Sequence, residues 1–136
     1  MMWPFSVPKP VPVVIIRDRL GREIDRVQGW NLERKDLRNR DWSHVDLRGQ
    51  CLDGSDISGA NMLGADLRGA SLNNCKLVGC EISYADVSGC DFSGSNMVGC
   101  SLYRSETQGA KFHKVLLSEE SDVPKIKVFQ TGRVTA

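Results

Sequence analysis

Hydrophobic residues recur at every fifth position through the middle of the chain. From residue 32 to residue 112 this spacing is unbroken, and sixteen of its seventeen positions are apolar. A helix repeats hydrophobic residues about every 3.6 positions and a strand every 2, so neither produces this row. A fixed internal period predicts a repeat architecture. The positions are Leu32, Leu37, Trp42, Leu47, Leu52, Ile57, Met62, Leu67, Leu72, Leu77, Ile82, Val87, Phe92, Met97, Leu102, Thr107 and Phe112.

Each five-residue unit has the same internal order around its central hydrophobic residue. The residue two positions before the centre is small from Ser55 onward, and the residue directly before the centre is mostly Asp or Asn. Two positions after the centre, glycine fills ten of the seventeen places. Residues two apart in extended backbone point to the same side, so the large and the small residue are predicted to share one interior. Glycine or asparagine tolerates the positive φ that a corner requires.

Three units carry this pattern most completely: residues 60–64 (Ala-Asn-Met-Leu-Gly), 65–69 (Ala-Asp-Leu-Arg-Gly) and 85–89 (Ala-Asp-Val-Ser-Gly). They closely resemble the A-(D/N)-L-X-X motif of the pentapeptide-repeat family, and the resemblance covers roughly 60% of the chain. The resemblance implies an all-β fold, a right-handed quadrilateral β-helix with one unit per side and twenty residues per coil. About four coils are then expected, stacked at about 4.8 Å each into a rod roughly 20 Å tall.

Residues 1–12 are expected to form an extended arm ahead of the repeats. They hold four of the five prolines in the chain, a density that favours extended backbone outside a sheet interior. A floppy terminus is the usual interpretation of such a segment. Trp3 and Phe5 favour docking instead, because an unattached arm has no physical reason to carry two aromatic rings. The sequence leaves open whether the arm docks on its own molecule or on another chain.

Residues 13–29 are predicted to form a β-hairpin cap that turns near Leu20-Gly21. A helix is the alternative, because hydrophobic residues at positions 16, 20, 24 and 27 follow helical spacing. Four consecutive β-branched residues and the central glycine favour the hairpin. The β-solenoid is assigned to residues 30–117. Residues 118–136 are expected to form a C-terminal cap and tail strand, since an open solenoid end exposes unpaired backbone.

The first coil departs from the repeat pattern. Trp30, Lys35, Arg40 and Gln50 occupy the position that is small in later units. An unpaired charge cannot be buried cheaply in a narrow interior. We therefore expect Lys35 and Arg40 to point out of the open end of the solenoid, or the opening turn to be distorted.

The five cysteines are explained by the repeat rather than by a disulfide framework. Cys51 precedes a central residue and is expected to face outward, whereas the other four occupy the small inward position, where a thiol behaves as a small hydrophobe. Their spacing matches no metal-ligand motif. Cys80 and Cys100 lie one coil apart, but parallel inward side chains are poorly placed for a disulfide. We expect reduced thiols, a reducing compartment such as the cytoplasm, and no metal or other cofactor.

Composition and charge mainly argue against certain classes of protein and partner. A chain of 136 residues is expected to form one domain. Its 18 basic and 17 acidic residues nearly cancel, so no global field favours nucleic acid or an anionic membrane as a partner. No hydrophobic run approaches the roughly 18 residues of a membrane span. Prolines interrupt the amino-terminal segment, so a secreted protein is not expected.

The outward residues are expected to carry the function, because the inward residues are used for packing. One column of acidic residues lies beside two arginines and predicts a self-compensated charge ladder. Its members are Asp46, Asp66, Asp86 and Glu106, with Arg48 and Arg68. Outward hydrophobic residues indicate a contact surface. The candidate partner-binding residues are Trp3, Phe5, Val11, Leu63, Tyr103, Val78, Val98 and Phe129.

Catalysis finds no support in the sequence. The two histidines, His44 and His113, fall near opposite ends of the repeats, and the chain shows no nucleophile–base grouping, phosphate-binding loop or His/Cys metal spacing. We therefore expect a non-enzymatic structural or interaction protein, docked by its arm and by its tail strand onto a larger protein assembly. A virion surface or cement (decoration) component is one version of this function. Self-association into a homo-oligomer or lattice is another.

DNA mimicry is the alternative function, because some pentapeptide-repeat proteins modulate type II topoisomerases such as gyrase by imitating duplex DNA. A duplex carries one negative charge per about 1.7 Å, so a rod roughly 20 Å tall would need around a dozen uncompensated charges. Residues 30–119 hold twelve acidic and ten basic side chains, a net charge of −2. Mimicry is therefore the less favoured interpretation.

Overall fold

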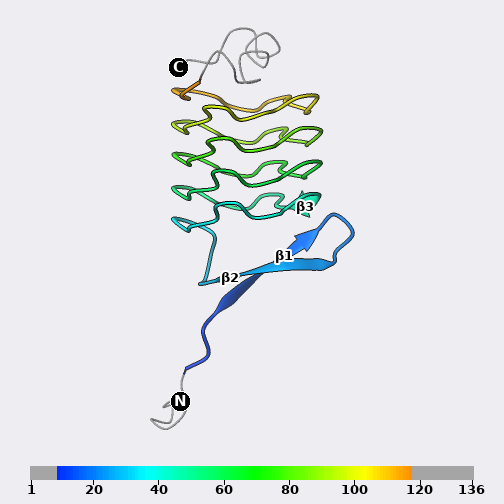
Figure 1. Cartoon of the computed structure of the whole chain (residues 1–136), viewed down its shortest axis with the longest axis vertical. Helices are drawn as coiled ribbons and strands as arrows, with labels where there is room; N and C mark the ends of the chain where they lie inside the picture. Colours follow the sequence, from blue (N-terminus) through cyan, green and yellow to red (C-terminus); the bar gives the residue numbers. More distant parts are fainter. Residues whose placement is uncertain (1–8, 118–136) are drawn as a thin grey trace.

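A hairpin followed by a stack of coils makes up the described part of the chain (Figure 1). The computed structural model describes residues 9–117. Its strands are β1 (Val13–Asp18), β2 (Glu23–Gln28) and β3 (Val45–Asp46), in the sheet order β2-β1-β3. Within residues 9–117, no helix is long and apolar enough to cross a membrane. The expectations that lie outside the described residues concern Trp3, Phe5, Phe129 and the tail 118–136.

Successive coils are joined by parallel backbone bridges between residues twenty positions apart. One such bridge links Asp66 to Asp86, and equivalent bridges follow at five-residue intervals around the coil. The Leu67 amide donates to the Asp86 carbonyl at 2.8 Å, and the Asp86 amide donates to the Ala65 carbonyl at 2.9 Å. Each bridge thus ties one coil to the next by two hydrogen bonds. This period of twenty residues per coil is the one that the resemblance to pentapeptide repeats implied.

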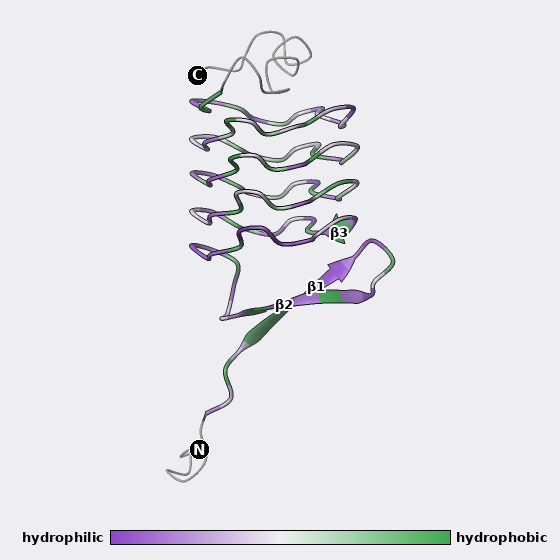
Figure 2. Cartoon of the chain, viewed as in Figure 1, coloured by the Kyte–Doolittle hydropathy of each residue, from purple (hydrophilic) through white to green (hydrophobic). Residues whose placement is uncertain are grey.

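The coil interior is filled by the large and small rows that the repeat predicted to face inward. Every central residue from Leu32 to Phe112 is at most 3% exposed, except Thr107, which is half-buried. Phe92 and Phe112 stack in neighbouring coils with their ring centroids 5.2 Å apart. Full burial of a side chain of this size contributes about 1.5–3 kcal/mol, so these rows supply the main hydrophobic stabilisation. Figure 2 shows hydrophobic and hydrophilic residues alternating along the coils.

The corners of the coils require backbone with positive φ. Glycine meets this need at Gly69, where φ is 69°. Asn74 and Tyr84 adopt φ values of 57° and 56° at equivalent corners. A side chain in this region is uncommon, and Tyr84 is the bulkiest residue to accept it in the regular coils. The corner position directs its ring into solvent, where Tyr84 is 57% exposed.

Serines of the small inward row bridge corners of the preceding coil. The hydroxyl of the fully buried Ser95 donates to the Leu72 carbonyl at 2.6 Å and accepts from the Cys75 amide at 2.9 Å. Where an alanine lies in the next coil, the corner closes directly, as from the Ala65 amide to the Met62 carbonyl at 3.1 Å. At these corners the serine hydroxyl therefore lies between the carbonyl and the amide that bond each other directly at other corners. Equivalent bridges are made by Ser55, between Leu32 and Lys35, and by Ser105, between Ile82 and Ala85.

Replacing Ser95 with alanine is expected to lower the free energy of unfolding by about 1 kcal/mol, because a buried hydroxyl bridge is lost while the corner can close directly, as at Ala65. Ser95→Val is expected to cost about 1–3 kcal/mol, since its extra methyl group overpacks the interior. Urea unfolding measures both changes. Ser58→Ala, on the outer surface, is the matched control and is expected to change little. A loss for Ser95→Ala that exceeded the loss for Ser95→Val would contradict direct closure.

Residues 13–28 form the predicted hairpin, and the helix that spacing allowed as an alternative is wrong. β1 pairs antiparallel with β2, with a register shift between Ile16 and Arg17. Gly21 lies in the turn with φ of 82°, and its amide donates to the Asp18 carbonyl at 2.9 Å. Ile16 and Val27 are buried, so one face of the hairpin packs on the hydrophobic core. β1 also pairs antiparallel with β3, which fixes the hairpin to the first coil.

A polar joint made by Asp25, Arg40 and Trp42 connects β2 to the first coil. The Asp25 Oδ2 accepts from Arg40 Nη1 at 2.8 Å and from the indole Nε1 of Trp42 at 2.7 Å. Trp42 is fully buried, while Asp25 and Arg40 are largely covered. Arg40 therefore avoids the burial of an unpaired charge, because its guanidinium pairs with the Asp25 carboxylate of the hairpin. Lys35, the other charged residue in the small row, is half-buried.

Candidate protein-interaction surfaces

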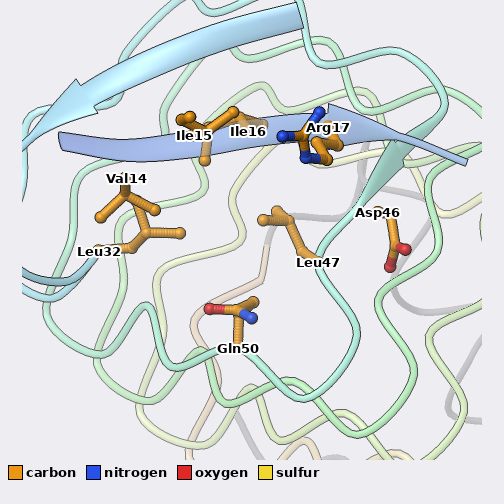
Figure 3. A pocket seen from close by; sticks show the side chains of 8 residues that line it. All are labelled: Val14, Ile15, Ile16, Arg17, Leu32, Asp46, Leu47 and Gln50. Atoms are coloured by element: carbon orange, nitrogen blue, oxygen red, sulfur yellow. The ribbon is translucent and has the colours of Figure 1, made fainter. Parts of the chain in front are cut away.

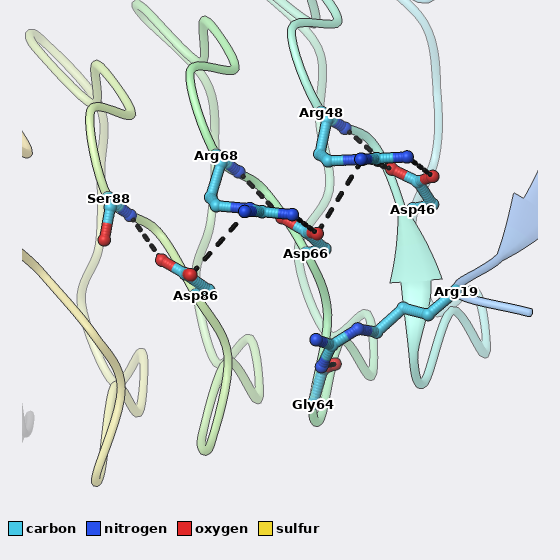
Figure 4. Close-up of polar contacts among 8 residues, drawn as sticks. All are labelled: Arg19, Asp46, Arg48, Gly64, Asp66, Arg68, Asp86 and Ser88. Atoms are coloured by element: carbon cyan, nitrogen blue, oxygen red, sulfur yellow. Dashed lines mark hydrogen bonds and ion pairs between the residues drawn. The ribbon is translucent and has the colours of Figure 1, made fainter.

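One side of the coil stack carries a ladder of ion pairs (Figure 4). Arg48 Nη2 lies 2.8 Å from Asp46 Oδ2 in its own coil, and Arg48 Nε lies 3.7 Å from Asp66 Oδ2 in the next coil. Arg68 repeats this arrangement, at 2.7 Å from Asp66 and 3.8 Å from Asp86. Each arginine is thus shared between two coils. This confirms the self-compensated ladder predicted from the columns of the repeat for Asp46, Asp66 and Asp86, whereas the predicted fourth member, Glu106, has no arginine partner in the ladder.

The ladder keeps its carboxylates ionised and neutralises them at the same time. Hydrogen bonds from Arg48 and Arg68 lower the pKa of Asp46 and of Asp66, respectively. The ladder ends at Asp86, where the backbone amide of Ser88 replaces an arginine as the donor. Alternating charges differ from the continuous negative surface of duplex DNA, which weighs against imitation of a duplex on this side.

The predicted partner-binding residues fall on separate parts of the described chain. Val11 lies in the arm and is 60% exposed. Leu63, Val78 and Tyr103 are exposed at 36%, 40% and 43%, with Leu63 and Tyr103 two coils apart in one column. Val98 is only half-buried and offers less surface than its column partner Val78. The structure therefore does not bring the predicted residues together into a single site.

A tyrosine pair forms an aromatic surface that sequence reasoning missed in part. Tyr84 and Tyr103 come from neighbouring coils and meet edge to face, with ring centroids 5.9 Å apart. Arg104 lies over the Tyr103 ring, 5.5 Å from its centroid, and its Nε donates to the Tyr103 hydroxyl at 3.1 Å. Tyr84 stands at a corner where the pattern expects glycine, and that departure was the signal for an outward ring. We call Leu63, Tyr84 and Tyr103 the tyrosine surface.

A second hydrophobic surface lies on the outer face of the hairpin. Val13 and Ile15 of β1 are 43% and 42% exposed, and Ile24 of β2 is also exposed. They continue the alternation that begins at Val11, because residues two apart in a strand share a face. This alternation could have been recognised in the sequence. We call Val11, Val13, Ile15 and Ile24 the N-terminal apolar stripe.

A crevice of about 220 Å³ separates β1 from the first coil (Figure 3). Val14, Leu32 and Leu47 give it aliphatic walls, and Arg17 and Asp46 are its charged members. The crevice thus lies outside the regular repeats, where the hairpin meets the first coil.

Glu33, Cys51 and Asp53 form the one group of metal-ligand types found close together among residues 9–117, with donor atoms within 4.8 Å of one another. The Cys51 thiol donates to Glu33 Oε1 at 3.3 Å, and Asp53 accepts from the Ser71 hydroxyl at 2.6 Å. A backbone hydrogen bond from Asp53 lowers the pKa of Cys51, but partial burial and the Glu33 carboxylate raise this pKa overall. Hydrogen bonds within the group and to Ser71 already account for these side chains, and we assign no metal to them.

The inward cysteines have buried, unreactive thiols. None of the five cysteines, all of which lie within residues 9–117, forms a disulfide, and this includes Cys80 and Cys100. Burial raises the pKa of the Cys75 and Cys80 thiols to about 12, despite opposing backbone hydrogen bonds. Both thiols donate to carbonyls of the preceding coil, Cys75 to Leu52 at 3.1 Å and Cys80 to Ile57 at 2.8 Å. These cysteines therefore act as small packing residues.

These features define a β-solenoid built from five-residue sides, with its exposed chemistry on outer surfaces. The chain belongs to the pentapeptide-repeat family: the family model "Pentapeptide repeats" matches residues 31–69, 51–83 and 80–118, in eight copies. This confirms the resemblance seen in the sequence. No curated protein sequence matches the chain.

Solved structures of other pentapeptide-repeat proteins share the fold. A protein of the Arabidopsis thaliana thylakoid lumen is 31% identical, with a TM-score of 0.64 over 68% of this chain and 63% of that one. HetL, involved in heterocyst differentiation regulation in the cyanobacterium Nostoc, is 24% identical, with a TM-score of 0.61 over 66% of this chain and 41% of that one. A further Nostoc protein is 24% identical, with a TM-score of 0.56 over 63% of this chain and 86% of that one. The chain thus spans less than two thirds of the length of the first two.

Proposed function

We propose that this chain is a rigid, non-enzymatic interaction module that docks onto a larger protein assembly through its N-terminal end. The observation that carries the proposal is the N-terminal apolar stripe, which leaves Val11, Val13 and Ile15 exposed at 60%, 43% and 42% on one continuous segment. Exposed apolar surface that is contiguous is typical of protein contact sites. The proline-rich arm leads directly into this stripe.

The coil stack supports the proposal by acting as a stiff body behind the docking end. Each coil is tied to the next by paired backbone hydrogen bonds and a buried core, so the stack has few internal degrees of freedom. Its charged side is compensated by Arg48 and Arg68. A neutral, stiff body suits repeated docking on a lattice. A virion surface or cement component, assembled in a reducing cytoplasm, is one such setting.

Deleting residues 1–12 is expected to reduce copurification of the partner from the native source at least tenfold. The coils should remain folded, because among residues 9–12 the deletion removes one backbone hydrogen bond, from the Gly29 amide to the Pro12 carbonyl at 2.8 Å, and none within the coils. Pull-down quantifies the partner, and thermal unfolding followed by circular dichroism checks the fold. Leu116→Ser, which removes an exposed hydrophobic residue from the coils, is the matched control and should retain the partner. Full recovery with the shortened chain would refute docking by the arm.

A further inference from the structure

The tyrosine surface is exposed on the outside of the coils, and its three residues are not part of the buried core. Leu63, Tyr84 and Tyr103 are 36%, 57% and 43% exposed. The Tyr84 amide donates to the Tyr103 carbonyl at 2.9 Å, which fixes the two rings on adjacent coils. Ser83 lies buried beneath them and bonds Ser101 through its hydroxyl at 2.9 Å. A preorganised aromatic surface of this kind is suited to binding, because little side-chain entropy is lost when a ligand arrives.

We propose that the tyrosine surface binds the proline-rich arm, residues 1–12, of a second copy of this chain. The inference rests on the proposed function, in that it retains docking by the arm and names another copy as its partner. Exposed aromatic rings beside hydrogen-bond donors are the surfaces that recognise proline-rich segments. The Arg104 guanidinium, whose Nε donates to the Tyr103 hydroxyl at 3.1 Å, supplies N–H donors next to the rings.

The arm has the composition that such a surface recognises. Proline occupies positions 8, 10 and 12, alternating with Val7, Lys9 and Val11. A segment of this kind favours the polyproline II conformation and loses little entropy on binding. Val11 is 60% exposed and free of the coils. Trp3 and Phe5 add aromatic rings that can pack against Leu63 and the tyrosines.

The direction of the arm favours a second copy over the same molecule. Figure 1 shows the described end of the arm running away from the coils, on the far side of the hairpin. Tyr84 and Tyr103 belong to coils beyond the first two, in the opposite direction. To reach them in its own molecule the arm would have to reverse, which alternating prolines resist because each fixes φ near −65°. A neighbouring copy can present its tyrosine surface without such a reversal.

Charge also fits this pairing. The only charged side chain in residues 1–12 is Lys9. Glu81 and Glu106 are exposed on the coils that carry the tyrosines, and Glu106 has no ion pair among the residues described. Lys9 of the arm is therefore expected to lie toward Glu81 and Glu106 and away from Arg104, which covers the Tyr103 ring, and this helps to set the direction of binding. Because the two surfaces differ, the contact is head to tail and can extend through many copies.

A complementation experiment with the full-length chain tests the inference. One variant loses the arm contacts (Trp3→Ser with Phe5→Ser), and another loses the tyrosine surface (Tyr84→Ser with Tyr103→Ser). Sedimentation velocity over a concentration series should show the wild type associating beyond 15.1 kDa, with each variant associating at least tenfold more weakly. An equimolar mixture of the two variants should recover a 1:1 dimer of twice that mass, because each supplies the surface that the other lacks. Leu20→Ser with Leu116→Ser, which removes two exposed hydrophobic residues outside the arm and the tyrosine surface, is the control and should associate like the wild type.

The failures of the inference and of the proposed function are distinguishable. A wild type that stays at 15.1 kDa at every concentration, or a mixture of variants that stays monomeric, would overturn the inference. The tyrosine variant would then still copurify with the partner assembly, and docking by the arm would stand. If the arm variant also retained that partner in full, the proposed function would fail as well.

Discussion

Phe92→Ala is expected to lower the free energy of unfolding by about 3–5 kcal/mol, which is a large part of the stability of a domain of this size. The ring is fully buried and stacks on Phe112 at a centroid distance of 5.2 Å. Its removal leaves a cavity that the coils above and below cannot close, because each is held by backbone hydrogen bonds to its neighbours. Urea unfolding monitored by far-UV circular dichroism measures the loss.

Two controls make the Phe92 prediction specific. Phe92→Leu keeps most of the volume and is expected to cost only about 1 kcal/mol. Thr107→Ala alters the one central residue that is half-buried, so its cost should be smaller still. A double-mutant cycle with Phe112→Ala should give a coupling of about 0.5–1.5 kcal/mol from the stacked rings. If Phe92→Ala cost no more than Phe92→Leu, the interior could not be close-packed.

The features that follow from one period applied to every unit could be predicted from the sequence. The buried row that contains Leu67, the small row that contains Ala65 and the ladder of Arg48 with Asp66 all depend only on position within the repeat. With five residues per side and the four sides that the family resemblance implied, residues twenty apart stack. The repeat and the resemblance together therefore predict contacts between residues far apart in the sequence.

Contacts at places where the repeat is broken could not be predicted in the same way. The pairing of Asp25 with Arg40 depends on how the hairpin lies against the first coil, and no periodicity relates the two segments. The Ser95 bridge could not be predicted, because the repeat identifies serine only as a small residue, whereas its hydroxyl bonds a corner of the preceding coil. Tyr84 was passed over because the pattern assigns its position to glycine.

For the candidate surfaces too, the residues within the regular repeat could be predicted and the others could not. Leu63 and Tyr103 were found because their column repeats, but Tyr84 joins them only through its unusual corner. The N-terminal apolar stripe lies outside the repeats, and its exposure depends on which face of the hairpin packs on the core. The parts of the candidate surfaces that could not be predicted, Tyr84 and the N-terminal apolar stripe, thus lie where the repeat is interrupted.

Asp25→Ala is expected to lower the free energy of unfolding by about 2–3 kcal/mol, because it leaves the buried indole N–H of Trp42 and the guanidinium of Arg40 without their acceptor. Asp25→Asn should cost less, since its amide oxygen can still accept from Trp42. The damage should be local to the joint. Relative to the wild type, hydrogen–deuterium exchange is therefore expected to be faster in β1 and β2 and little changed in the later coils. Uniform exchange across all coils would contradict a local joint.

The same joint predicts how stability depends on pH. Burial alone would raise the pKa of Asp25, but hydrogen bonds from Trp42 and Arg40 outweigh it and hold this pKa below its ordinary value of 3.8. A carboxyl whose pKa is lowered by folding stabilises the native state above its unfolded pKa, and this contribution disappears as the pH falls through the lowered folded value. Wild type should therefore have a higher free energy of unfolding than Asp25→Asn at pH 7, and this difference should shrink below about pH 4.

Arg22→Ala is a contrasting case. Arg22 is the exposed ion-pair partner of Asp18, so the difference in free energy of unfolding between this variant and the wild type should be small at pH 7. Urea unfolding at several pH values gives the comparison, and a gap that stays constant down to pH 2.5 would show that the charge of Asp25 does not hold the hairpin to the coils.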